Sequence, residues 1–516
     1  MVCGPYNGCN IYYNMNKSKV IINGFIWTIV NNVVYIIFGF ISVPILIKFF
    51  GKDTYGLIGL AGSVNVYLHL LDMGMTDTNV RFFSEYIAKK QDDKTQKLLS
   101  FTFLFYLVIG VINSIVLFIV SFYVGSLFKV TEEQAVILQH LILILALNAT
   151  FSWVSACMDQ YLRAHDLMDW LKKRGTVLRL SVFVFLAITV VFKLPIEFYY
   201  FFNVFAITFI LPLSVLKAKK ITPEIKIKPQ FDKATCTTVL PYAFTIFSFS
   251  IFQFLAFNFR PLLLGNIIGP DAVADFNIIQ TITSIVTLFS GALIPVLLPV
   301  VTKMKVTNDE SGVSKMMLTG TKYVTILLTV IIFIIVLVSK ELLVLYVGEQ
   351  FAGLSKWLIL WVLTLLLNHR SVMTSLVFTE KKLKEVAYMG FSAMCVAFVV
   401  YFICVPQYGV GGVIMGFTAH EIIHTLFYYL YFLPRRFHIN TRKVFSHSVL
   451  PVWLVLCVVL IGVYYLGNLF SLSVIWSAIL KGILFILVAI PAIWCLLFDS
   501  EDRLFVLSKL KIKNKV

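Results

Sequence analysis

The sequence predicts an all-α polytopic membrane protein. Of its 516 residues, 59% are hydrophobic and only 13% are charged, which is more apolar surface than a soluble chain of this size can bury. Unbroken apolar runs of about 18 residues, the length of a membrane-spanning helix, follow one another, for example at 108–125 and 323–339. Because these runs do not alternate polar and apolar residues, they predict helices rather than the strands of an outer-membrane barrel.

About 14 membrane-spanning helices are expected from these runs. They lie near 23–47, 55–79, 99–125, 134–157, 176–192, 197–216, 239–264, 276–301, 319–338, 356–378, 387–405, 413–432, 449–466 and 475–497. Most of the 43 lysines and arginines fall in the two tails and in the loops after even-numbered spans. Since basic residues mark the cytoplasmic side, both termini are predicted to be cytoplasmic. This bias also accounts for the net charge of +17, so no nucleic acid partner is expected.

A short repeat suggests two similar halves. "YVGSLF" at 123–128 recurs as "YVGEQF" at 346–351, and "FFGKDTYG" at 49–56 corresponds to "IIGPDAVA" at 267–274. An even number of spans separates the copies, so both halves point the same way through the membrane. We therefore expect two six-helix lobes, related by a pseudo-two-fold axis along the membrane normal, and two extra C-terminal helices. Glycines that gather by chance at helix ends are the alternative explanation.

The predicted segments follow from the spans and the repeat. They are a cytoplasmic tail at 1–22 with translation starting at Met15, an N-lobe at 23–216, a cytoplasmic inter-lobe loop at 217–238, a C-lobe at 239–432, a cytoplasmic loop at 433–448, two further spans at 449–497 and a basic cytoplasmic tail at 498–516.

The chain lacks the features of two classes of enzyme, membrane glycosyltransferases and nucleotide hydrolases. Its longest predicted external loop, 339–355, is too short for the external domain of a membrane glycosyltransferase, and no G-x-x-x-x-G-K-[ST] phosphate loop is present. The eight cysteines include no C-x-x-C pair, so neither a disulfide framework nor a thiolate metal site is expected. A compact helical bundle without cofactor, with its working surface inside, predicts a transporter.

Three stretches carry a resemblance to a known family. "YGLIGLAGSVNVYLHLLDMGMTDTNVRFFSEY" at 55–86 resembles the second span of bacterial polysaccharide flippases, which have a "YG" start, an "LLDxGL"-type core and a basic-aromatic end. "NFRPLLLGNIIGPDAVADFNI" at 258–278 is similar to the end of their seventh span, although Phe259-Arg260 replaces the usual Asp-Arg pair. "YGVGGVIMG" at 408–416 resembles the start of span 12. The resemblance places the chain in the superfamily of multidrug, oligosaccharidyl-lipid and polysaccharide exporters.

The resemblance implies a function. Members of this branch move undecaprenyl-pyrophosphate-linked oligosaccharides from the cytoplasmic to the outer leaflet of a bacterial inner membrane by alternating access, for surface polysaccharides such as O-antigen or capsule. The implied partners are the lipid-linked oligosaccharide, a polysaccharide polymerase and other assembly proteins. Protons and sodium both stay open as the coupling ion. A multidrug exporter of the same superfamily is the alternative, and the two extra helices favour a lipid-linked substrate.

A remote alternative rests on "HEIIH" at 420–424. His420 and His424 would share a helix face and bind zinc, with Glu421 as the general base of an intramembrane metalloprotease. The remainder of the protease pattern is absent, and 14 spans exceed what such an enzyme needs.

Ionisable residues inside predicted spans are functional candidates, because burying a charge in hydrocarbon is costly. His69 and Asp72 lie in span 2, and His420, Glu421 and His424 lie in span 12. Together they would carry a coupling proton or hydrogen-bond sugar hydroxyls. The alternative is that Glu421 and His424 pair to stabilise their helix.

Three arginines at different depths are predicted to guide the pyrophosphate, because a guanidinium stays charged and grips phosphate with two donors. Arg370 in span 10 is the first candidate, Arg260 toward the outer end of span 7 the second, and Arg81 at the cytoplasmic end of span 2 the third. His369 is a further candidate for the same cavity. A structural ion pair, or snorkelling to a lipid headgroup, is the alternative role.

Overall fold

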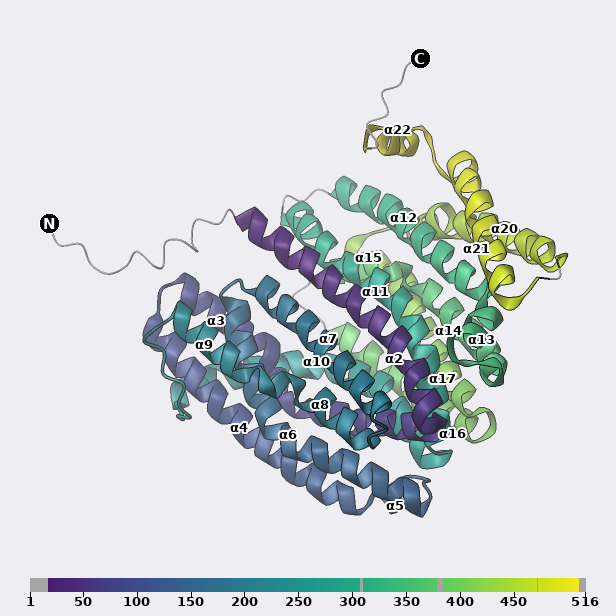
Figure 1. Cartoon of the computed structure of the whole chain (residues 1–516). Helices are drawn as coiled ribbons and strands as arrows, with labels where there is room; N and C mark the ends of the chain where they lie inside the picture. Colours follow the sequence, from purple (N-terminus) through teal and green to yellow (C-terminus); the bar gives the residue numbers. More distant parts are fainter. Residues whose placement is uncertain (1–16, 307–309, 378–383, 471, 510–516) are drawn as a thin grey trace. The chain divides into compact units, whose positions relative to one another are not determined.

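A computed structural model describes residues 17–306, 310–377, 384–470 and 472–509, which form helices and no strand (Figure 1). The chain divides into two compact units, Met1–Asn277 and Ile278–Val516. The predicted start at Met15 and the end of the basic tail, 510–516, lie outside the described residues.

The first unit begins with a long helix that bends at a glycine. Gly51 has a φ of 85° and a ψ of 161°, a conformation that glycine reaches without the steric cost of a Cβ. The helices of this unit are α2 (Lys17–Leu68), the 3-10 turn η1 (His69–Asp72), α3 (Met75–Ala88), α4 (Asp92–Phe122), α5 (Val124–Leu127), α6 (Glu132–Ala164), α7 (Met168–Val191), α8 (Ile196–Phe209), α9 (Leu211–Ile221), α10 (Lys233–Ile267) and the first turns of α11 (Pro270–Val306).

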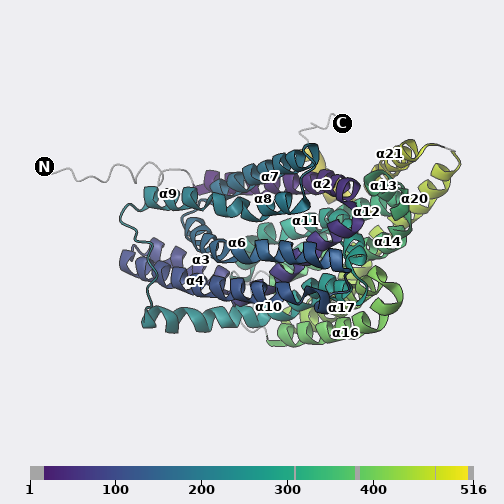
Figure 2. The same cartoon turned by 60° about the horizontal axis from the view of Figure 1, so that its bottom comes forward.

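Helix α6 is the centre of this unit. It lies side by side with α4 (Figures 1 and 2), and it also packs on α3, α8 and α2. A capping box at Thr131 and Gln134 starts the helix, and many of its side chains, apolar and polar, are buried. Helix α6 therefore carries many of the side chains that meet inside the unit.

The second unit contains the rest of α11 and the later helices. Helices α16 and α17 pack closely, because Gly412 and Gly416 of α17 leave room for α16: a Cβ on Gly416 would lie 2.3 Å from the Tyr401 ring. The helices and turns are α12 (Glu310–Leu337), α13 (Ser339–Val347), η2 (Glu349–Leu354), α14 (Ser355–Thr364), η3 (Leu365–Arg370), α15 (Ser371–Val377), α16 (Lys384–Tyr408), α17 (Val410–Phe427), η4 (Tyr428–Phe432), α18 (Leu433–Phe437), α19 (Thr441–Val444), η5 (Phe445–Val449), α20 (Leu450–Asn468), α21 (Val474–Ala492), η6 (Ile493–Leu497) and α22 (Ser500–Lys509).

Twelve helical segments of the described chain are long and apolar enough to cross a membrane. The prediction of an all-α polytopic membrane protein is confirmed. The count differs from about 14 because the first two expected spans fall in one kinked segment, Val30–Asp72, and because α10 is not among the twelve. The stretch expected as a loop at 339–355 is helical, formed by α13 and η2. The pseudo-two-fold relation between two lobes stays a prediction.

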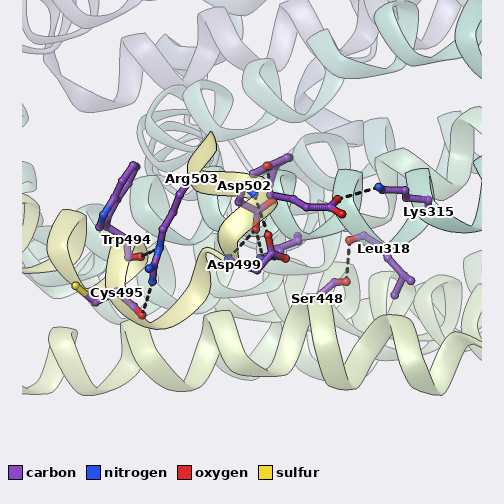
Figure 3. A network of polar contacts seen from close by, with 11 residues as sticks. Lys315, Leu318, Ser448, Trp494, Cys495, Asp499, Asp502 and Arg503 are labelled. Carbon is purple, nitrogen blue, oxygen red and sulfur yellow. Dashed lines mark hydrogen bonds and ion pairs between the residues drawn. The ribbon is translucent and has the colours of Figure 1, made fainter. Parts of the chain in front are cut away.

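The last described helix is the short polar α22, which is bound to α12 within the second unit (Figure 3). Asp502 of α22 forms an ion pair with Lys322 of α12 and accepts a hydrogen bond of 2.5 Å from the Tyr323 hydroxyl. Glu501 lies 2.9 Å from Lys315 Nζ. Carboxylates at the start of α22 also suit the positive end of its dipole.

Candidate functional site

The first polar site lies where the first membrane segment is interrupted. After the 3-10 turn η1, Met73 and Gly74 have φ values of 48° and 77°, and α3 then starts in a new direction. Gly74 is closely covered by α10, since a Cβ there would lie 2.4 Å from the Ala243 carbonyl oxygen. A break of this kind leaves backbone groups in need of partners, which is tolerated in a membrane only inside protein or beside a wet cavity.

Asp72 accepts hydrogen bonds from the first turn of α3. Its carboxylate accepts hydrogen bonds from the Thr76 backbone N–H at 3.1 Å and the Thr76 hydroxyl at 2.9 Å, in the first turn of α3, where a negative charge is favourable. The Tyr106 hydroxyl of α4 donates a third bond at 2.7 Å. A carboxylate offers about four acceptor positions, so one is left for another donor.

A buried polar chain holds this arrangement in place. Gln160 of α6 donates from Nε2 to the Tyr106 hydroxyl at 2.7 Å and to the Thr76 hydroxyl at 3.1 Å. Its Oε1 accepts a bond of 2.9 Å from Asn79, whose own oxygen accepts one from Thr102. Apart from Thr76, these residues are all buried. Because each member satisfies its neighbour, the network rigidifies the site at little cost.

Beside this network is a cavity of about 360 Å³ lined by residues of the first unit. It is open to the outside, since His69 and Arg163 in its lining are exposed. It brings together the predicted pair His69 and Asp72 with side chains of α6. The Trp153 ring contacts two other rings of the site. It stacks on Tyr106, with centroids 5.5 Å apart and an interplanar angle of 20°, and its centroid lies 5.1 Å from that of His69. The lining residues are His69, Asp72, Thr76, Ser152, Trp153, Ala156, Asp159, Gln160 and Arg163.

One wall of the cavity is an ion pair between α6 and α7. Arg174 grips Asp159 through two bonds of 2.8 and 2.5 Å and donates a third, of 2.6 Å, to Ser214. This two-pronged geometry is the strong form of an arginine–carboxylate pair. Asp159 is therefore largely neutralised by Arg174.

A tight contact joins the bend of α2 to the start of α11, both within the first unit. A Cβ on Gly56 would lie 2.0 Å from the Pro270 carbonyl oxygen. Lys52 and Asp275 add an ion pair of 2.9 Å. The two stretches include the repeated motifs "FFGKDTYG" and "IIGPDAVA", and Gly51 and Gly269 both have positive φ. By the predicted topology, this closed contact is on the external side.

The second polar site is a buried cluster in the second unit. Arg370 ends the 3-10 turn η3 and forms an ion pair with Glu421 of α17. Its Nη1 donates to the Glu421 backbone carbonyl at 3.2 Å and to the Thr425 hydroxyl at 3.0 Å. Arg370 and Glu421 are 9% and 2% exposed. The structure thus places the first predicted phosphate ligand in an internal ion pair.

The three predicted histidines of this unit are also buried. His420 Nδ1 lies 3.3 Å from Glu421, and its ring lies 4.8 Å from that of His424. His369 is held separately, by the Leu366 carbonyl and the Tyr429 hydroxyl.

The geometry offers little support for a zinc site. Glu421, the would-be general base, is committed to Arg370. Among the described residues, no group of three or more His, Cys, Asp or Glu side chains is placed to hold a metal ion.

Arg81 and Arg260 belong to the first unit and do not line its cavity. The guanidinium of Arg81 is exposed and lies 4.2 Å from the centre of the Tyr242 ring, a cation–π contact at the surface. Arg260 is buried, donates from Nε to the Phe257 carbonyl at 2.8 Å and lies between two phenylalanine rings.

Comparison with known proteins adds the family. The sequence model of the family "Polysaccharide biosynthesis protein" matches residues 21–305, more than half of the chain. The chain belongs to the polysaccharide biosynthesis protein family. This membership confirms the resemblance seen in the sequence. The comparison with curated proteins finds no match.

Solved structures similar to this polysaccharide biosynthesis protein share its fold. A lipid II flippase, MurJ, in an inward closed conformation has a TM-score of 0.72 at 16% identity, over 91% of this chain and 98% of that one. An inward-facing multidrug resistance transporter of the MATE family has a TM-score of 0.62 at 13% identity, over 81% and 96%. At this identity the likeness concerns the fold alone.

Some site residues of this family member were missed by the sequence analysis. Asp159, Gln160 and Arg163 fall just after the predicted span 134–157, in a predicted cytoplasmic loop, where basic and acidic residues are ordinary. Their spacing with Ser152 and Ala156 places all five on one face of α6. This pattern is visible in the sequence, but the sequence does not show which other residues face it. Tyr106 and Trp153 were hidden among the many aromatic residues.

Proposed function

We propose that the protein is a transporter, not an enzyme, that flips undecaprenyl-pyrophosphate-linked oligosaccharide repeat units from the cytoplasmic to the outer leaflet by alternating access. The observation that carries this proposal is the membership of an all-helical, polytopic chain in the polysaccharide biosynthesis protein family. Its product would serve a surface polysaccharide such as O-antigen or capsule.

The polar cavity of the first unit supports this function. A pyrophosphate and its sugars cannot cross hydrocarbon unaided, so the protein must offer a polar path. The break at 69–74 and the hydrogen-bonded network around Asp72 would supply polar surface within the predicted second span, as discontinuous helices do in transporters. The closed contact between Gly56 and Pro270 fits a state that is shut on the predicted external side.

The predicted phosphate ligands take different parts in this proposal. Arg370 reaches a phosphate only when its pair with Glu421 opens, so the two would act as a latch that the substrate displaces. Arg260 would need to leave its position between two aromatic rings, and Arg81 would attract substrate from the surface. His369, His420 and His424 would line the path or carry a coupling proton; the coupling ion is a proton or sodium in this proposal.

The proposed location is a bacterial inner membrane with both termini in the cytoplasm. A polysaccharide polymerase and other assembly proteins would receive the flipped unit on the outer side.

The second candidate function is export of organic cations. Asp72 next to the rings of Tyr106 and Trp153 favours it, because a carboxylate and aromatic faces bind organic cations. Arg163 in the same cavity opposes it, since like charges repel. The flippase reading is therefore the better supported of the two.

A strain lacking the gene tests the proposal. The strain should accumulate lipid-linked repeat units on the cytoplasmic face of the inner membrane and lose surface polysaccharide, and plasmid expression of the chain should restore both. Unaltered surface polysaccharide together with new sensitivity to cationic drugs would replace the flippase by the multidrug exporter. Zinc content measured in the purified protein and in a His420→Ala variant would decide the protease reading.

A further inference from the structure

The cavity of the first unit contains two kinds of polar group. Gln160, Thr76 and Tyr106 bond to one another and to Asp72, and Asp159 bonds to Arg174, so these groups form a fixed frame. Others face the cavity with bonding capacity left. Within the described chain, His69, Ser152 and Arg163 have no side-chain hydrogen bond, and Asp72 keeps one acceptor position. A rigid frame that presents open donors and acceptors is the form of a binding site.

The open groups are spread along α6. Ser152 and Arg163 are eleven residues apart on the same helix face, which separates them by roughly 16 Å along its axis at 1.5 Å per residue. Trp153 and its neighbour His69 lie toward the Ser152 end. Arg163 lies in the last turn of α6. The cavity is therefore elongated, with an aromatic and hydroxyl-rich end and a cationic end.

The two ends differ in the chemistry that they recognise. At the Ser152 end, an aromatic face, a carboxylate, an imidazole and a hydroxyl can contact a ring that carries hydroxyl groups, through its apolar face and its polar rim. At the other end, a guanidinium without an ion-pair partner among the described residues matches a phosphate, to which arginine offers two parallel donors. A volume of about 360 Å³ is within the range of small-molecule sites.

We propose that this cavity binds a glycosyl phosphate, with the phosphate at Arg163 and the sugar ring against Trp153. Asp72, His69 and Ser152 hydrogen-bond the sugar hydroxyls, and the Asp159–Arg174 pair forms the wall between the two ends. The inference rests on the proposed function, because a sugar joined to phosphate is the part of the lipid-linked substrate that the cavity would hold. Arg163, which lies outside the residues singled out from sequence, is the determinant of phosphate binding.

Titration of the purified full-length protein in nanodiscs tests the site. The probes are the 1-phosphates of glucose, galactose and N-acetylglucosamine, the three free sugars, inorganic phosphate, and rhodamine 6G as an organic cation. At least one sugar phosphate should bind more tightly than its free sugar and than phosphate. Arg163→Gln should weaken that binding about 10-fold or more, the size expected for one charge-assisted contact.

Two further variants distinguish the loss of a specific binding contact from a general loss of structure. Arg179→Gln is the matched control, because Arg179 is an arginine of the same unit that lies over the Tyr35 ring and outside the cavity; it should leave binding unchanged. Ser152→Ala should weaken the sugar phosphate but not inorganic phosphate. Equal affinities for Arg163→Gln and Arg179→Gln, or rhodamine 6G binding that depends on Asp72 while no sugar phosphate binds, would overturn the inference.

The lipid composition of the nanodiscs decides whether Arg163 instead holds a membrane headgroup. Sugar phosphate should bind equally well in zwitterionic discs and in discs with anionic phospholipid. Loss of binding in the anionic discs would assign Arg163 to the headgroup and contradict the site.

Export measured in cells distinguishes a failure of the proposed binding site from a failure of the proposed flippase function. If the gene is needed for export and Arg163→Gln exports as well as Arg179→Gln does, the site is wrong and the flippase stands. If the gene is dispensable for export, the flippase itself is wrong.

Discussion

Arg370 and Glu421 are opposite charges placed together inside the membrane-spanning part of the second unit, where only 9% and 2% of their surfaces are exposed. Removing one partner leaves the other charge buried without compensation, which costs about 3–5 kcal/mol. We therefore expect Arg370→Ala and Glu421→Ala each to lower the thermal midpoint of the purified protein strongly. The double variant Arg370→Met with Glu421→Leu should be more stable than either, because no charge stays buried.

The same series tests whether Arg370 is a phosphate ligand. Thermal unfolding followed by intrinsic fluorescence, together with export in cells, gives both readouts. If Arg370→Ala unfolds at the normal temperature yet abolishes export, Arg370 serves the substrate rather than the fold, as its position in the sequence predicted. If the stable double variant exports normally, the latch role is excluded.

Single residues were partly predictable from the sequence. A charge inside an apolar run is visible without a structure, which is why Asp72, Arg370 and Glu421 were all singled out. Their partners were not visible, because Arg370 meets Glu421 from a different helix, 51 residues later. Asp72 likewise depends on Tyr106, 34 residues away. Pairings between helices follow from packing, which composition and spacing do not contain.

At the scale of elements, the contact between α2 and α11 offers a direct test of alternating access. Gly56→Ala introduces a methyl group where a Cβ would lie 2.0 Å from the Pro270 carbonyl oxygen, so this closed contact cannot form. We expect cysteines replacing Lys52 and Asp275 to be joined efficiently by a short bifunctional thiol reagent in the wild-type background, and poorly with Gly56→Ala. Export should fall in parallel at an unchanged membrane level.

Gly62→Ala is the matched control for this experiment. Gly62 is in the same helix with nothing within 4 Å of its would-be Cβ, and alanine is the better helix former by about 1 kcal/mol. Undiminished cross-linking in the Gly56→Ala variant would show that the contact is not a gate.

The docking of α22 is expected to depend on pH. Burial raises the pKa of Asp502, but hydrogen bonds from Lys322 and Tyr323 outweigh it and hold that pKa below its usual range. A lowered pKa means that the ionised carboxylate stabilises docking above the ordinary aspartate pKa of about 3.9, and that this stabilisation is lost as the pH falls through the lowered value. A nitroxide at the exposed Leu504 should therefore be immobile at pH 7 and become mobile only as the pH falls well below the ordinary aspartate pKa of about 3.9.

Substitutions test at neutral pH whether the Asp502 carboxylate holds α22 in place. Asp502→Asn should release the label at pH 7, whereas Glu501→Gln should not, because the Glu501–Lys315 pair is exposed and exposed pairs contribute at most about 1 kcal/mol. Equal mobility of the two variants would show that Asp502 does not hold α22.

The spanning helices were more predictable from the sequence than the breaks within them. The long apolar runs predicted the spanning helices well, since a run of about 20 apolar residues is long enough to cross the bilayer as a helix. The 3-10 breaks at 69–72 and 365–370 were not predicted. Apart from Gly74 at the first break, no Gly or Pro marks these positions, and the turns depend on contacts such as those of Gly74 with α10.

At the scale of the whole molecule, the orientation predicted from basic residues is open to labelling. Single cysteines in the predicted cytoplasmic stretches 217–237 and 433–448 should be shielded from a membrane-impermeant thiol reagent in intact cells. Those at exposed positions of 265–275 and 339–355, such as Asn266 and Glu349, should react. Reaction of the 217–237 cysteine from outside would reverse the orientation and with it the direction of the proposed transport.

The central claim is that this chain moves a lipid-linked oligosaccharide across a bilayer, and proteoliposomes measure this most directly. Purified protein is reconstituted with a fluorescent undecaprenyl-pyrophosphate oligosaccharide, and a membrane-impermeant enzyme that cleaves the glycan reports the fraction exposed outside. In liposomes that contain the protein, the lipid-linked oligosaccharide of the inner leaflet should reach the outer leaflet over time and be cleaved. In protein-free liposomes it should stay protected. Arg163→Gln should slow this transfer, and Arg179→Gln should not. Identical exposure with and without the protein, alongside active uptake of rhodamine 6G by the same liposomes, would contradict the central claim.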